Sequence, residues 1–241
     1  MSNIIFLDLE LTQNKGSSPK IIQIGAVAVC IHTGKIKSIF SEVANPGEMP
    51  CRFISALTGI YEDEVAAARP LREVLTSFFG WLSQSQCGME VRTWGGGDLR
   101  AIKEASEEYL KPDEIAALPI NPLHLREVNV KPILSDLKIM SGLSKKGGLG
   151  ASMKALGMDF IGREHDALWD AFNTARIYFL DLQVREAGLR ALKRNWAQNS
   201  RPRKALETLT LMEDKIRDKA HKSILTEEEE SIVRGERMRG V

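Results

Sequence analysis

Three apolar runs of strand length lie within the first 43 residues, and a carboxylate interrupts the first of them. Residues 4–9 form the first run, broken only by Asp8. Residues 21–31 are rich in isoleucine and valine, and residues 36–43 follow after a short turn around Gly34. Runs of this length and β-branched content are typical of strands, and the short turn favours antiparallel pairing. We therefore expect the chain to begin with a three-stranded antiparallel meander.

Helical periodicity replaces the strand pattern further along the chain. Residues 166–185 are the clearest helix, because apolar side chains recur there at intervals of three and four. A short strand is expected at residues 91–94. Further helices are expected at residues 73–82, 99–110, 131–139 and 149–156. Strands first and helices later predict an α/β or α+β architecture in which helices pack on a mixed sheet.

The composition changes towards the carboxyl end of the chain. A length of 241 residues suits one large domain with an appendage. We expect a domain over residues 1–188 and a basic linker with a helical extension over residues 189–241. Residues 190–204 carry six basic side chains, Trp196 and no acidic residue. This segment is either a solvated linker or a surface that follows a phosphate backbone, with Trp196 stacking on bases.

Overall composition excludes several classes of protein. Apolar residues make up 43% of the chain and charged residues 27%, which excludes wholesale disorder. The net charge of +1 does not by itself indicate a polyanionic partner. Cys30, Cys51 and Cys87 form no CxxC pair, which favours reduced thiols over disulfides or a structural zinc site. No apolar run approaches the roughly 18 residues of a membrane helix, so we expect a cytoplasmic protein without membrane contact.

Acidic residues mark three places at strand or helix ends. Asp8 and Glu10 are two residues apart, so their side chains share one face of the first strand. Asp98 follows three glycines at a junction between strand and helix, and His165 and Asp170 bracket the start of the last long helix. Each place has an ordinary explanation as a solvated pair, a helix cap or a structural histidine. Against this, a carboxylate inside an apolar strand needs a partner or a cation.

In this order and spacing, these residues resemble the DEDDh group of the RNase T and DnaQ-like exonuclease superfamily. The first motif, Asp-x-Glu, matches Asp8-Leu9-Glu10, and the second matches Gly97-Asp98-Leu99 in a form similar to Eri-type and KapD-like RNA exonucleases. The third, His-x4-Asp, matches His165 to Asp170. The resemblance covers residues 3–182. It implies a ribonuclease H-like mixed sheet with helices on both faces, to which this chain adds its helical extension.

The resemblance also implies which residues act. The catalytic residues would be Asp8, Glu10, Asp98, His165 and Asp170, and the four carboxylates among them would be the metal ligands. Such carboxylates repel one another unless cations lie between them. Hard oxygen ligands favour two Mg2+ or Mn2+ ions, which stabilise the attacking and leaving oxygens of a phosphodiester displacement. We expect Asp8 to bridge the ions and His165 to be the general base.

The implied reaction begins at a free 3′ end and releases nucleoside 5′-monophosphates from a single strand. Leu11, Thr12 and Thr58 are the expected substrate-binding residues. Leu11 falls at the family's wedge between terminal bases, although many relatives have threonine there, and Thr58 lies in a segment that resembles the one closing over the substrate terminus. Trp169 departs from the family pattern, since a small or acidic residue is expected before Asp170.

Alternatives remain open for the substrate and for the activity. RNA is the preferred substrate, because the second motif and residues 57–60 are similar to Eri-type enzymes. A DNA exonuclease of the proofreading or repair type would use the same catalytic residues. A nucleic-acid-binding adaptor on an idle fold is the alternative from another class, but all five catalytic residues are present. Self-association as a homodimer is also open, since many relatives dimerise.

Overall fold

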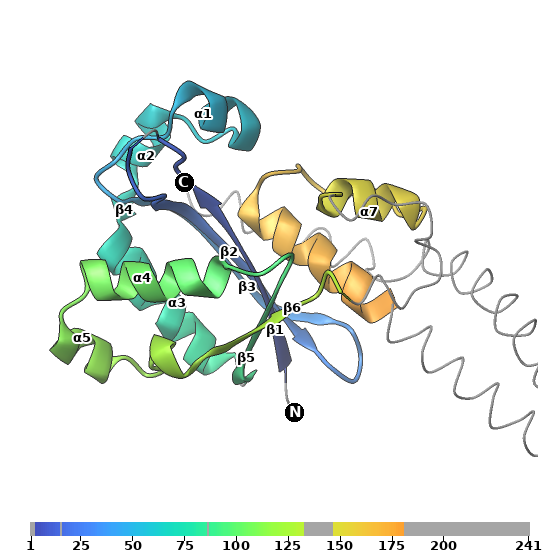
Figure 1. Cartoon of the computed structure of the whole chain (residues 1–241). Helices are drawn as coiled ribbons and strands as arrows, with labels where there is room; N and C mark the ends of the chain where they lie inside the picture. Colours follow the sequence, from blue (N-terminus) through green and yellow to red (C-terminus); the bar gives the residue numbers. More distant parts are fainter. Residues whose placement is uncertain (1–2, 15, 86, 133–146, 181–241) are drawn as a thin grey trace, which may run out of the picture.

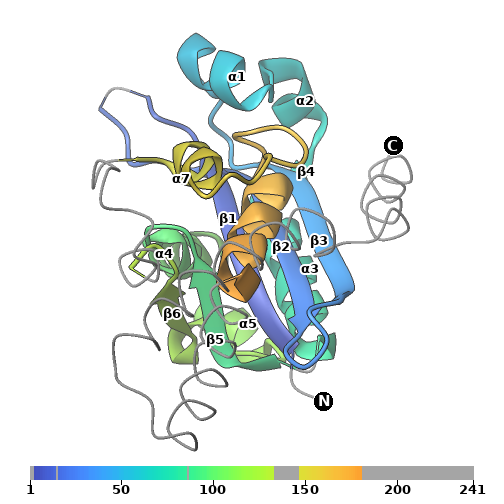
Figure 2. The ribbon, with the colours of Figure 1, turned by 90° about the vertical axis from the view of Figure 1, so that its right-hand side faces the viewer.

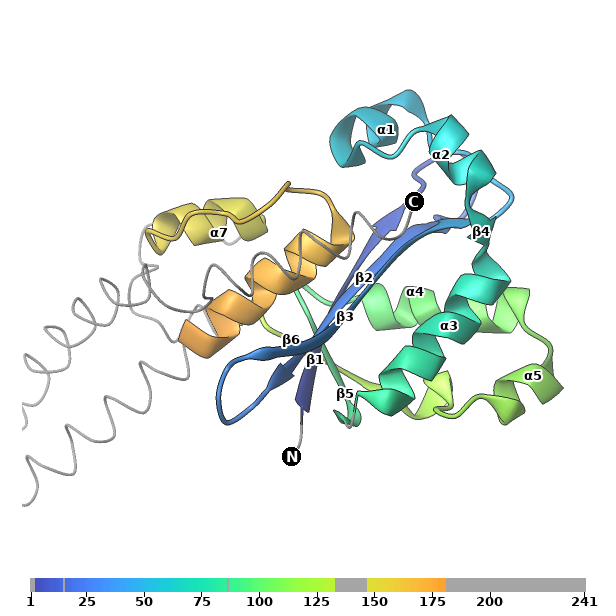
Figure 3. The same ribbon diagram turned by 180° about the vertical axis from the view of Figure 1, so that it is seen from behind.

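The structure, a computed structural model, describes residues 3–14, 16–85, 87–132 and 147–180 (Figure 1). A six-stranded mixed sheet in the order β4-β3-β2-β1-β5-β6 forms the centre of the molecule. Helices cover both of its faces, as Figure 3 shows from behind. The predicted α/β class with helices on both faces of a mixed sheet is therefore confirmed.

The amino-terminal meander forms as predicted and places the two acidic residues of the first strand. It consists of β1 (Asn3–Leu11), β2 (Ile21–Cys30) and β3 (Ile36–Asn45), paired antiparallel. In this register Asp8 lies opposite Gly25 and Glu10 lies opposite Gln23. The short β4 (Arg69–Pro70), β5 (Cys87–Thr93) and β6 (Arg126–Asn129) complete the sheet by parallel pairing.

Alternation along β1 divides the core into two layers. Ile5, Leu7 and Leu9 belong to a core shared with α3 (Leu71–Gln84) and α4 (Asp98–Tyr109) on one face. Ile4 and Phe6 belong to a second core, which is built with the helix over residues 167–180 on the other face. Because successive side chains point to opposite faces, Asp8 and Glu10 lie on the face of helix 167–180.

Several short elements were not predicted. They are α1 (Arg52–Thr58), α2 (Glu62–Ala67), α5 (Pro112–Ala117), the 3-10 turn η1 (Pro122–His124) and β6. The helix predicted at residues 149–156 is α7 (Leu149–Ala155). Residues 131 and 132 form a turn, and the rest of the helix predicted at residues 131–139 lies outside the described residues. The boundary at residue 188, the basic segment at residues 190–204 and the tail also lie outside them. Among the described helices, none has the length and apolarity to cross a membrane.

Candidate active site

Two residues of β2 bring the start of helix 167–180 onto β1. Gly25, opposite Asp8, lies so close to the helix that any side chain there would collide with the backbone of Ala167 and Leu168. Gln23, opposite Glu10, accepts a hydrogen bond from the Ala167 N–H at 3.1 Å. The glycine and the buried amide thus seat the helix start directly beside the two carboxylates of β1.

The loop before this helix is held by the residues that follow the third motif. The Asn173 side chain accepts from the Ile161 N–H at 3.2 Å and donates to the Ile161 carbonyl at 2.8 Å. Arg176 donates to the Asp159 carbonyl at 2.6 Å. His165 has a φ of 61°, a left-handed conformation that is rare outside glycine and that needs such support.

Trp169, which departs from the family pattern, is a core residue. It is buried and meets Phe172 edge-on, with ring centroids 5.9 Å apart. Its indole lies against Gly162, where any side chain would collide with the ring. The tryptophan therefore packs under the loop that carries His165.

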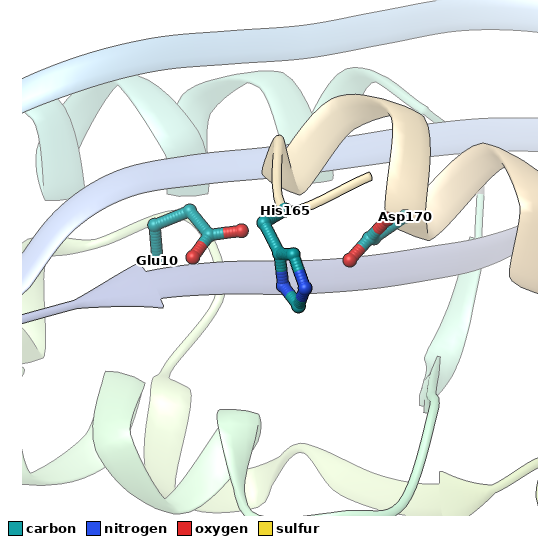
Figure 4. Close-up of side chains that lie close together, drawn as sticks. All are labelled: Glu10, His165 and Asp170. Carbon is teal, nitrogen blue, oxygen red and sulfur yellow. The ribbon is translucent and has the colours of Figure 1, made fainter. Parts of the chain in front are cut away.

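The third motif and the first meet in one cluster. One ligand atom from each of Glu10, His165 and Asp170 lies within 4.8 Å of the other two (Figure 4). One carboxylate oxygen of Asp170, Oδ1, is buried without a hydrogen-bond partner. Asp170 is not the cap of its helix, because Asp166 accepts the capping bond from the Leu168 N–H. A buried anionic oxygen without a partner is costly, so this donor set fits a cation.

Asp98 lies at the start of α4, directly after the glycines that follow β5. The strands β1 and β5 are parallel, so their carboxyl ends lie at the same edge of the sheet. Gly95, Gly96 and Gly97 all have positive φ, between 81° and 110°, and α4 begins directly after them. The N-cap residue of α4 is Gly97, which has no side chain to cap the helix. The charge of Asp98 raises the pKa of Asp8, and neither carboxylate belongs to the cluster of Glu10, His165 and Asp170.

Burial raises the pKa values of all four carboxyl groups, and neighbouring carboxylates raise them further. Burial raises the pKa of Asp8 well above its usual value, and Asp98, Asp170 and Glu10 raise it further. Burial, followed by the charges of Asp170 and Asp166, raises the pKa of Glu10 to about 8. Burial raises the pKa of Asp98 to about 7, with Glu127 adding to the effect, and burial raises the pKa of Asp170 to about 7. Without cations, the pocket holds protons at neutral pH.

The three predicted substrate-binding residues differ in what they offer. Thr12 is fully buried and its hydroxyl accepts the Lys20 N–H at 2.8 Å. The Thr58 hydroxyl donates to the Ile54 carbonyl at 2.9 Å and accepts the Ile60 N–H at 3.2 Å. Leu11 is partly buried and packs against the core shared with α3. Both threonine hydroxyls are thus engaged by the backbone, and a role in substrate binding stays a prediction for all three residues.

Sequence reasoning missed exposed and charged residues around residues 57–60. Phe53 on α1 is 68% exposed and Tyr61, just before α2, is 57% exposed. Arg163 donates to the Leu57 carbonyl at 3.4 Å and its charge lowers the pKa of Glu10. Figure 2 shows α1 and α2 above the loop that leads to helix 167–180. The sequence does show an aromatic residue on each side of residues 57–60. It does not show that both are exposed, because α1 is too short for its pattern to indicate which side chains face solvent.

Comparisons with known proteins agree on one family. The RNase T family model, described as exonuclease, matches residues 5–178. ERI1 exoribonuclease 2 of Danio rerio is 30% identical over 187 residues, which are 72% of this chain and 34% of that protein. Human 3'-5' exoribonuclease 1 is 27% identical, over 75% of this chain and 52% of that protein. The chain thus spans between a third and a half of these relatives.

A solved structure shares the fold. The nuclease domain of 3'hExo, a DEDDh family member bound to rAMP, superposes with a TM-score of 0.61 and 24% identity. The match covers 76% of this chain and 92% of that one. The ribonuclease H-like exonuclease fold implied by the three motifs is therefore confirmed.

Proposed function

Because the chain belongs to the RNase T exonuclease family, we propose that it removes nucleoside 5′-monophosphates from the 3′ end of single-stranded RNA in a metal-dependent reaction. The observation that carries this proposal is the cluster of Glu10, His165 and Asp170, in which a buried oxygen of Asp170 has no hydrogen-bond partner. These are residues of the first and third family motifs, brought together from opposite ends of the matched region.

The residues proposed to hold metal are the four carboxylates Asp8, Glu10, Asp98 and Asp170. Their oxygen donors suit Mg2+ or Mn2+, and their raised pKa values reflect a pocket that favours added positive charge. Two such ions, when bound, stabilise the charge on the attacking and leaving oxygens of the phosphodiester. Asp8, whose pKa is raised by each of the other three, would contribute a ligand oxygen together with them.

His165 is proposed to take the proton from the attacking water. Its exposed side chain lies beside Glu10 and Asp170, on a loop whose left-handed backbone is held by Asn173 and Arg176. A neutral imidazole nitrogen can accept a proton from water and release it in the next cycle. The same position would also let a ring nitrogen act as a metal ligand, and these two roles predict different effects of its removal on metal affinity.

RNA is the proposed substrate because the relatives reported above include exoribonucleases. The exposed rings of Phe53 and Tyr61, on either side of residues 57–60, are proposed to stack on bases near the 3′ end. Arg163 places a guanidinium between this segment and the acidic pocket, where it can meet a phosphate. A cytoplasmic location and self-association remain further predictions, which fractionation and light scattering of the full chain would check.

The experiment that tests the proposal uses 5′-labelled single-stranded RNA and DNA of the same base sequence. Each is incubated with the full chain in Mg2+, in Mn2+ and in chelator, alongside the Asp8→Asn variant. We expect the wild type with metal to shorten RNA stepwise from its 3′ end. We expect no shortening in chelator or with the Asp8→Asn variant. Faster shortening of DNA would make it a deoxyribonuclease. Binding of either strand without shortening in any metal would instead favour an adaptor.

A further inference from the structure

The glycine loop, residues 95–97, connects β5 to Asp98 in a conformation that needs outside support. Its φ values of 93°, 81° and 110° are left-handed at three successive residues. Glycine adopts such values without steric cost, but it loses more conformational entropy on ordering than any other residue. A chain of three glycines does not by itself fix where the next side chain lies. Whatever holds this loop therefore helps to set the position of the Asp98 carboxylate.

Glu127 on β6 holds the loop on both sides of Asp98. Its carboxylate accepts the Gly97 N–H at 3.0 and 2.9 Å and the Leu99 N–H at 3.2 Å. It also accepts the Thr93 hydroxyl at 2.9 Å, which fixes the carboxylate to the end of β5. These amides belong to the first turn of α4, where the cap residue Gly97 has no side chain. Glu127 thus supplies from a neighbouring strand the acceptor that a capping side chain would otherwise supply.

Asn129 holds the beginning of the same loop. Its side-chain oxygen accepts the Gly95 N–H at 3.0 Å, and its side-chain nitrogen donates to the Gly95 carbonyl at 3.1 Å. The Val130 N–H donates to the Thr93 carbonyl at 2.9 Å and continues the pairing of β6 with β5. The glycine loop is therefore bonded to β6 at its first residue, Gly95, and at its last, Gly97. A further bond from Leu99 to Glu127 holds the chain directly after Asp98.

We propose that Glu127 is a positioning residue that places the Asp98 carboxylate for metal binding, with Asn129 fixing the start of the glycine loop. This inference rests on the proposed role of Asp98 as a metal ligand.

The bonding pattern indicates a variant that separates position from charge. Oε1 of Glu127 accepts from Thr93, Gly97 and Leu99, whereas Oε2 accepts only from Gly97, which Oε1 also contacts. A glutamine with its carbonyl oxygen in the place of Oε1 loses the charge and keeps an acceptor for the Thr93 hydroxyl and the Leu99 N–H, but its amide nitrogen replaces Oε2 beside the Gly97 N–H, where two donors face each other. Glu127→Gln is therefore the conservative variant, and Glu127→Ala removes both bonds and charge.

Calorimetric titration of the metal-free full chain with Mn2+ tests this directly. We expect Glu127→Ala to weaken Mn2+ binding about ten-fold or more, the usual range for residues that orient a metal ligand. Glu127→Gln should weaken binding less than Glu127→Ala, because the bonds to Oε1 have an acceptor in both glutamate and glutamine. In the Asp98→Ala background, Glu127→Ala should cause little further loss, because the two act through one ligand. In turnover of RNA, Glu127→Ala should lower kcat and leave KM unchanged.

Glu90→Ala is the matched control, because Glu90 is a carboxylate on the adjacent β5 that pairs with Arg92 and Arg126 and makes no bond to the glycine loop. Melting curves in chelator establish that every variant is folded. Wild-type Mn2+ affinity in Glu127→Ala, an equal loss in the Asp98→Ala background, or the same loss in Glu127→Gln would overturn the positioning role. Wild-type affinity in Asp98→Ala alone would instead reject the proposed metal ligand, and the inference with it.

Discussion

The Gln23 side chain accepts a hydrogen bond from the Ala167 N–H at 3.1 Å, joining residues that are 144 positions apart. Gln23 is buried and lies opposite Glu10, so this one bond links the two halves of the acidic pocket. It also replaces a helix cap for an amide that would otherwise be buried without an acceptor.

Gln23→Leu should therefore cost both stability and activity. Leaving the Ala167 N–H unpaired costs about 1–3 kcal/mol, and we expect kcat to fall because the start of helix 167–180 carries Asp170 and follows His165. Chemical denaturation and single-turnover rates would measure the two effects. Gln84→Leu, at an exposed site at the end of α3, is the control and should change neither. Unchanged turnover in Gln23→Leu would mean that this bond does not position the pocket.

Asp8→Asn and Asp170→Asn should abolish turnover without lowering the stability of the metal-free protein. Removing one negative charge relieves repulsion among groups whose pKa values are already raised. We expect turnover to be lost while the melting temperature in chelator is unchanged or higher. Melting curves with and without Mn2+ check this, and the stabilisation by Mn2+ should shrink in both variants. A large drop in metal-free stability would identify these carboxylates as structural.

Metal-free stability should fall as pH rises from about 4 to about 8. The folded-state pKa values of Glu10, Asp98 and Asp170 are about 8, 7 and 7, above the ordinary values that apply in the unfolded chain. Because folding favours their protonated forms, their contribution is complete below the ordinary values and is lost as pH rises through the raised ones. Each kcal/mol lost lowers the melting temperature of a chain of this size by about 2–4 °C. With Mn2+ bound, stability should rise with pH over this range. In Asp98→Asn without metal, the fall in stability with pH should be smaller than in the wild type.

The elements that could be predicted are those whose pattern is long enough to be periodic. The ten residues of β2 and the nine of β1 carry their own signal, and the period of two was sufficient to place Asp8 and Glu10 on one face. The spacing of His165 and Asp170 predicted a shared helix start. The close approach of that helix at Gly25 depends on which strand lies next to β1, which no local pattern reports.

β6 and its side chains could not be predicted for a physical reason. The strand has four residues, Arg126–Asn129, and its single aliphatic residue is Val128. Nothing local distinguishes it from a loop, because its stability comes from pairing with β5 and from the bonds of Glu127 and Asn129 to the glycine loop. The ordinary explanation of Asp98 as a helix cap fails for a related reason: the N-cap of α4 is Gly97, and an acceptor for its first turn comes from Glu127, 28 residues beyond Leu99.

His165→Ala should lower turnover by about 10² or more, the scale of a lost general base. We expect Mn2+ affinity, measured by titration of the metal-free chain, to change little. A fall in Mn2+ affinity as large as that of Asp170→Asn would show that the histidine is a metal ligand, a role that its distance from Glu10 and Asp170 also permits.

Phe53→Ala and Tyr61→Ala should weaken the binding of single-stranded RNA without altering the chemical step. Stacking of one base on an aromatic ring is worth about 1–3 kcal/mol, and both rings are more than half exposed beside residues 57–60. We expect KM to rise in each variant while kcat at saturating RNA stays close to that of the wild type. Leu123→Ala is the matched control, because Leu123 is an exposed apolar residue in the η1 turn, away from α1.

The two aromatic residues also offer a way to locate the bound end of the strand. If the two rings stack on bases near the 3′ terminus, each alanine variant should raise KM by the same factor for a dinucleotide and for a longer RNA, since both carry the contacted bases. If only the longer RNA is affected, the rings contact bases further upstream, and the terminal base is held by Leu11 and the residues around it. If the wild type, Phe53→Ala and Tyr61→Ala have equal KM values for the dinucleotide and for the longer RNA, Phe53 and Tyr61 are not part of the RNA-binding surface.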